Sequence, residues 1–169
     1  MVVTLDSWTV GAVKLAEIEG MPAETFRSYR SRFGLLDHVK TVRGLPAQFS
    51  FADALTARLA FTMMRLGFDK KDICDYVGHS PVALKPFLEG RPVEICLRDG
   101  HLSHSRILND DPFLSIPMER DGWAVAEAFL ADIRGRKGPE AAEGARSHLE
   151  QNISRIRDGY LRQPVGRGG

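Results

Sequence analysis

Residues 25–36 contain three arginines and a tyrosine at a spacing that suits one short helix. These residues are Arg27, Tyr29, Arg30 and Arg32. On a helix, Phe26 and Phe33 can be buried on one side while the arginines extend from the other. Guanidinium groups presented in this way bind phosphate oxygens and base edges. The alternative is an ordinary surface helix with solvated arginines, because charged runs usually form solvated faces.

Histidines and acids around residue 105 are the other side chains that could do chemistry. His101 and His104 precede Asp110 and Asp111. In a strand, residues three apart point to opposite faces, so the two histidines would not converge on one metal ion. The sequence also has no glycine-rich phosphate loop, nucleophile elbow or paired-carboxylate motif. We therefore expect neither an enzyme nor a metal or cofactor site.

The composition indicates a folded protein of a reducing compartment. The chain has 169 residues, of which 43% are apolar, enough for the core of one domain or two small ones. Its net charge is +1, so any affinity for nucleic acid must come from one face, and residues 27–43 hold five cations against Asp37. Cys74 and Cys96 form no disulfide or zinc pattern and are expected to be buried. Neither a signal peptide nor a membrane span is indicated, and we expect a cytoplasmic protein.

Two short helices are predicted before residue 35. Apolar residues at helical spacing begin near Val10, and Gly20 ends this segment. A second helix starts after Pro22, carries the arginines and ends at Gly34. Two helices joined by a tight turn, the second of them basic, are typical of a helix-turn-helix.

A hairpin and two more helices complete the first half. Alternating residues predict a β-hairpin, or wing, over residues 39–43. Ser50, with Asp53 three residues later, resembles a capping box that starts a third helix. Asp69 can cap a fourth helix that ends at Gly78.

Three stretches occur here in a recognisable order. They are TVGAVKLA at residues 9–16, TFRSYR followed by FGLL within residues 25–36, and RLGFDKKDI at residues 65–73. With this order and spacing, the chain from residue 8 to residue 77 resembles the winged-helix DNA-binding domain of MerR-type transcriptional regulators. Phage excisionase-like proteins share a related winged fold.

The resemblance implies that the second helix enters the major groove and that the wing lies along the DNA backbone. The contacts of the helix would fall to Arg27, Tyr29 and Arg30, with Lys40 and Arg43 as wing cations. The expected DNA-binding residues are Thr25, Arg27, Tyr29, Arg30, Arg32, Lys40 and Arg43.

The chain departs from the family pattern in two places. Ser28 stands where the family has an aromatic residue, and residues 44–49 replace its Gly-Tyr-Arg-x-Tyr at the end of the wing. The replacement is one residue longer and has no arginine. Phe49 can still fill the core as the family's last tyrosine does.

The second half does not continue as the long dimerisation helix of the family. Prolines make residues 79–92 a linker, and we place a domain boundary near residue 90. Strands are predicted at residues 93–98, 101–108 and 113–116, with an Asp-Gly turn between the first two, which makes a β-meander.

Two helices are predicted after the meander. Asp121 can cap the first, which Gly135 ends, and the second runs from Glu140. The second helix has an apolar stripe, which can contact a partner or its own domain: Ala142, Ala145, Leu149, Ile153, Ile156 and Tyr160. We expect residues 93–162 to form an α+β dimerisation or effector region and residues 163–169 a flexible tail.

The predicted fold class is mainly α with small β, with a winged helix-turn-helix over residues 1–78 and a small α+β region after it. The expected function is that of a sequence-specific transcriptional regulator that binds double-stranded DNA as a homodimer on inverted half-sites. The alternative is a winged-helix adaptor that holds RNA polymerase or another regulator, or an excisionase-like architectural protein.

Overall fold

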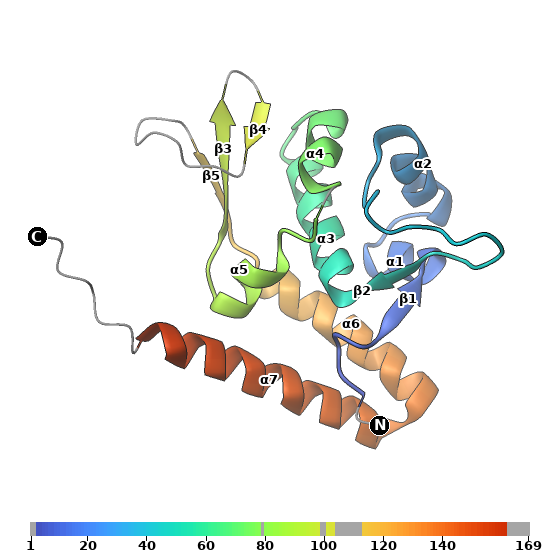
Figure 1. Ribbon diagram of the computed structural model, residues 1–169, viewed down its shortest axis with the longest axis vertical. Helices are drawn as coiled ribbons and strands as arrows, with labels where there is room; N and C mark the ends of the chain where they lie inside the picture. The colour runs from blue at the N-terminus through green and yellow to red at the C-terminus, as the bar shows by residue number, and fades with distance from the viewer. Residues whose placement is uncertain (1–2, 79, 99–100, 104–112, 162–169) are drawn as a thin grey trace, which may run out of the picture.

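Helix α3 (Phe51–Arg65) lies at the centre of the fold. The computed structural model describes residues 3–78, 80–98, 101–103 and 113–161 (Figure 1). Helices from both halves of the chain pack against α3, which is buried on most of its circumference, as expected for a helix inside a core. The predicted class, mainly α with small β, is confirmed.

Helices α1 (Ala12–Ile18) and α2 (Ala23–Phe33) form the predicted pair. In the turn between them the amide of Met21 donates to the carbonyl of Ala16 at 3.0 Å. Gly34 ends α2 in the left-handed conformation, with φ of +73°, which glycine adopts without steric cost.

A two-stranded antiparallel pair ties the start of α1 to the start of α3. Strand β1 (Thr9–Gly11) pairs with β2 (Gln48–Ser50), and Val10 lies opposite Phe49 with both side chains fully buried. The capping box of Ser50 is confirmed. Asp69 caps α4 (Lys70–Val77), as predicted, by accepting from two backbone amides.

The predicted hairpin over residues 39–43 is wrong. Residues 40–47 contain no strand, and they form a loop that protrudes from the body between α2 and β2 (Figure 1). Alternation specifies a strand only where one face is buried, and residues 40–46 are all exposed. The loop instead contains a turn in which Leu45 N donates to Val42 O at 2.9 Å, with Gly44 at φ of +84°.

The segment expected as a linker contains a helix that the sequence did not predict. Helix α5 (Leu84–Glu89) includes Pro86, which is tolerated because it lies in the first turn. Phe87 is fully buried, with its ring edge-on to Phe51 at 5.9 Å and to Trp123 at 5.9 Å. One buried core extends from Leu5 across this segment to Ile153.

The second sheet is antiparallel, but its strand order differs from a meander. Strand β3 (Val93–Arg98) lies in the middle, between β4 (His101–Ser103) and β5 (Phe113–Ile116). The predicted meander is therefore wrong, because β5 pairs with β3 and not with β4. Val93 and Ile116 face each other there and are both buried. The Asp-Gly turn and residues 104–108 lie outside the described residues.

Helices α6 (Glu119–Lys137) and α7 (Pro139–Leu161) run in opposite directions beneath the rest of the fold (Figure 1). Helix α6 starts before Asp121, which lies in its first turn and is not its cap, and it continues through Gly135. The break comes at Gly138, whose φ of +90° ends the helix. On α7, the stripe residues Ala142, Ala145, Leu149 and Ile153 are buried against the chain's own core.

Gly122 lies where α6 meets the ring of Phe87. A Cβ at this position would lie 2.2 Å from a ring carbon of Phe87, which is fully buried and cannot move away. Gly122→Ala is expected to lower the free energy of unfolding by about 1 to 3 kcal/mol. Urea denaturation measures the change.

Gly135 on the same helix supplies the matched control. It is exposed, and a Cβ there would meet no atom within 4 Å. Gly135→Ala is expected to raise stability by about 0.5 to 1 kcal/mol through helix propensity alone. Equal effects of the two substitutions would contradict the close packing of α6 on α5.

Candidate nucleic-acid interface

The basic side of α2 is held outward by aromatic packing behind the helix. Phe26 is fully buried and its ring lies edge-on to Phe49, with centroids 5.5 Å apart. Arg27 and Arg32 are exposed, as predicted. Within the described parts of the chain, neither side chain has an ion-pair or hydrogen-bond partner. Both guanidinium groups are therefore available to an external ligand.

Tyr29 is mainly a packing residue in the free protein. Its ring centroid lies 5.7 Å from that of Phe61 and 6.1 Å from that of Phe33. Lys70 Nζ lies 5.5 Å from the centroid of the same ring. Thr25, in the first turn of α2, is half-buried. Contacts of Tyr29 and Thr25 with DNA stay predictions.

Arg30 does not extend outward with the other arginines, so this part of the expectation is wrong. Its Nη2 donates to the carbonyl of Val39 at 2.9 Å, and its guanidinium lies 4.9 Å from the ring centroid of Phe49. Helical spacing places Arg30 one turn from Phe26, on the half-buried edge of α2. Burial lowers the pKa of Arg30 from its usual value, although Asp37 and Asp53 oppose this effect.

The loop cations lie beyond α2. Lys40 and Arg43 are exposed and have no side-chain partner among the residues that the structure describes. Val42 and Leu45 in the same loop are 62% and 63% exposed. The loop therefore presents cations and apolar side chains together.

A depression of about 290 Å³ lies between α1, α2 and this loop. Arg27, Arg30, Ser31, Thr41 and Ala12 line it. The structure thus brings Arg27 and Arg30 to one place. It does not bring Arg32, Lys40 or Arg43 to the same depression.

A buried polar cluster positions the segment after α2. Asp53 Oδ1 lies 2.7 Å from Nε2 of His38, and Asp53 Oδ2 accepts from the amide and hydroxyl of Ser50 at 2.8 and 2.7 Å. His38 Nδ1 lies 3.0 Å from the carbonyl of Gly78. The carbonyl of Gly78 can only accept, so the Nδ1 contact needs a proton on that nitrogen, and the Nε2 contact joins the ring to the carboxylate.

The role of His38 could not be found from the sequence. The capping box indicated Asp53, but nothing near residue 38 shows which part of the chain that carboxylate meets. A partner for Arg58, in contrast, could have been predicted from the sequence. A charged residue inside an apolar stretch of helix needs a partner.

That partner is Glu19, at the end of α1. Arg58 Nε donates to Glu19 Oε2 at 2.6 Å, and Arg58 Nη2 donates to Ile18 O at 2.9 Å. The Glu19 side chain is 1% exposed, and its Oε1 has no partner among the described residues. Burial raises the pKa of Glu19 to about 7, because desolvation outweighs the attraction of Arg58.

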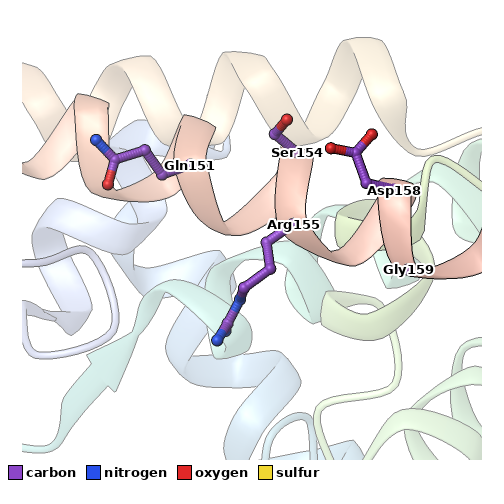
Figure 2. Close-up of a pocket in the computed structure, with 5 residues that line it drawn as sticks. All are labelled: Gln151, Ser154, Arg155, Asp158 and Gly159. Atoms are coloured by element: carbon purple, nitrogen blue, oxygen red, sulfur yellow. The ribbon is translucent and has the colours of Figure 1, made fainter.

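A larger depression, of about 470 Å³, lies on the outer side of α7. Figure 2 shows its lining residues, all from that one helix: Gln151, Ser154, Arg155, Asp158 and Gly159. Their side chains point in different directions, with Arg155 directed away from Ser154 and Asp158 (Figure 2). A ligand there would meet donors from a single element, so we do not regard it as the functional site.

Metal ligands and membrane spans are not evident in the part of the chain that the structure describes. Within it, no three His, Cys, Asp or Glu residues are placed to hold a metal ion. His104, Asp110 and Asp111 lie outside the described residues. None of the described helices combines the length and the apolar character that crossing a membrane requires.

Comparison with known proteins gives no relative from which a function could be transferred. No family model, curated protein or solved structure matches this chain.

Glu19 makes the stability of the fold depend on pH. Because its pKa is about 7 in the folded chain and 4.5 without the fold, the folded state holds the proton more tightly. Protonation of Glu19 therefore adds to the free energy of unfolding. This stabilisation is fully present below about pH 4.5 and is lost as the pH rises through about 7. Glu19→Gln removes it. The stability of the variant relative to the unaltered chain should rise between pH 5 and pH 8 by on the order of 2 kcal/mol.

Urea denaturation at several pH values measures this difference. Glu17→Gln, at an exposed position of the same helix, is the control and should leave the pH profile unchanged. Parallel profiles for Glu19→Gln and the unaltered chain would show that burial does not perturb Glu19.

Proposed function

We propose that this chain is a transcriptional regulator, similar to the MerR type, that binds double-stranded DNA sequence-specifically. Helices α1 and α2 would form its helix-turn-helix. The observation that carries the proposal is a set of exposed cations without acidic partners in the described residues: Arg27 and Arg32 on α2, and Lys40 and Arg43 on the adjoining loop. With a net charge of only +1, attraction to a polyanion depends on such local clustering.

The support behind α2 suits a helix that reads DNA. Phe26 and Tyr29 anchor α2 through Phe49 and Phe61, so its exposed side chains are presented from a rigid base. Phe49 fills the core at the place where the family pattern has its last tyrosine, which supports the resemblance. Arg27 would both position α2 on the backbone and read base edges in the major groove, and Arg32 would contact phosphate.

The loop of residues 40–46 would replace the wing. Its exposed cations, Lys40 and Arg43, would neutralise backbone phosphates without a hairpin. We include a homodimer on inverted half-sites in the proposal, as the family resemblance implies. Four residues of the apolar stripe of α7, from Ala142 to Ile153, would not form its interface, because they are buried inside the chain. Ile156 is half-buried, and the side chain of Tyr160 lies outside the described residues.

A protein-interaction adaptor has less support. It was expected to use its second sheet and last helix, and the apolar stripe of that helix is buried from Ala142 to Ile153. The exposed large apolar side chains of the described residues all lie in the first half of the chain: Val13, Val42, Leu45 and Leu66.

The test is binding to duplexes selected from a random pool, measured over a range of salt concentrations. Arg27→Ala should weaken specific binding by about 1 to 3 kcal/mol, as expected for the loss of a base contact. Arg32→Ala should reduce the slope of log affinity against log salt by about 1, as expected for a lost phosphate contact.

Arg155→Ala, at an exposed position on α7, is the matched control and should change neither quantity. Wild-type affinity and salt dependence in both α2 variants would contradict the proposed function, and so would a chain that enriches no duplex.

A further inference from the structure

Among the described residues, those that line the depression between α1, α2 and the loop are four hydrogen-bond donors and Ala12, with no carboxylate. Arg27 and Arg30 supply guanidinium groups, and Ser31 and Thr41 supply hydroxyls. The Ser31 hydroxyl donates only a long bond, 3.4 Å, to Ser28 O. The Thr41 hydroxyl has no partner among the described residues. Such a lining selects an acceptor with several oxygens.

Within the described part of the protein Arg30 makes no ion pair, although Asp37 and Asp53 attract its charge from a distance. Asp53 is the nearby buried acid, but both of its oxygens are already used by His38 and Ser50. Asp37 is exposed and makes no ion pair with Arg30 among the described residues. A half-buried cation that makes no ion pair is costly to desolvate, so an anionic ligand beside it is favoured.

The depression has room for such a ligand. At about 290 Å³, it can hold several water molecules, each of which occupies about 30 Å³ in the liquid. A tetrahedral oxyanion with part of its hydration shell therefore fits. Guanidinium groups bind phosphate oxygens in pairs of parallel hydrogen bonds, which lysine cannot do.

We infer that this depression is a binding site for a phosphate group, and that in a DNA complex a backbone phosphate occupies it. Arg30 then acts as a phosphate ligand held in place by Val39 and Phe49, not as a reader of bases. The identity of the occupant rests on the proposed DNA-binding function. The existence of the site does not, because free phosphate offers the same oxygens.

The first experiment titrates the isotope-labelled full chain with inorganic phosphate at constant ionic strength and follows the backbone amides by NMR. We expect saturable shifts around Ser31 and Thr41. Arg27→Ala should weaken phosphate binding about tenfold or more, the usual effect of losing one charge-assisted contact. Thr41→Val should weaken it by a smaller factor.

Arg155→Ala is the control, because Arg155 is an exposed arginine on α7 and does not line the depression. It should leave the phosphate affinity unchanged. Arg27 and Thr41 are both exposed, so their variants test the site without disturbing the core as a change at Arg30 would. Shifts that do not saturate, or that Arg27→Ala and Arg155→Ala weaken equally, would overturn the site.

The second experiment adds a selected duplex to the phosphate-bound chain. Displacement of phosphate by the duplex would place a backbone phosphate in the site. Duplex binding that leaves phosphate bound would overturn that assignment and retain a site for free phosphate. If the chain binds phosphate but no duplex, the DNA-binding function fails while the site stands. If it binds duplex but no phosphate, the site fails while the function stands.

Discussion

Asp53 is a buried carboxylate that joins three parts of the chain. One oxygen meets His38 in the segment after α2, the other accepts twice from Ser50 at the start of α3, and the same histidine reaches Gly78 at the end of α4. A buried charge is tolerated only when it is paired and hydrogen-bonded. Loss of a hydrogen-bond partner leaves such a carboxylate unsatisfied and costs about 1 to 3 kcal/mol, or more when the group is charged, out of the roughly 5 to 15 kcal/mol that stabilises a typical domain. The segment after α2 is therefore held firmly.

The position of Arg30 follows from this constraint. His38 is followed by Val39, whose carbonyl accepts from Arg30, so the cluster around Asp53 also sets where that guanidinium lies. The backbone is under strain here, because Leu36 is fully buried with φ of +56°. The exit of α2 also passes close to the end of α4. A Cβ at Gly78 would lie only 3.1 Å from the carbonyl of Gly34. The position of the basic surface thus depends on a tightly packed turn as well as on α2 itself.

Features set by neighbours in the sequence could be predicted, and features set by distant partners could not. Ser50 with Asp53, and Asp69 before α4, act within three residues, so their caps were evident from the sequence. The prediction of a hairpin over residues 39–43 was wrong because alternation of residue types does not show whether one face is buried. The predicted outward orientation of Arg30 was wrong for a related reason, because Phe49 and Val39 approach it only in the folded chain. The exposure of Arg27 and Arg32 was predictable, because no apolar periodicity passes through them.

The first turn of α3 belongs to two networks that support opposite halves of the molecule. Ser50 and Asp53 hold the segment next to α2, while Phe51 lies edge-on to Phe87 of α5 and Phe129 of α6, at 5.9 and 5.7 Å. Consecutive residues on a helix point about 100° apart, so a single turn can serve a polar cluster on one side and an aromatic one on the other. The α6–α7 pair therefore braces the same turn that positions the basic surface, although its own side chains do not line the depression there.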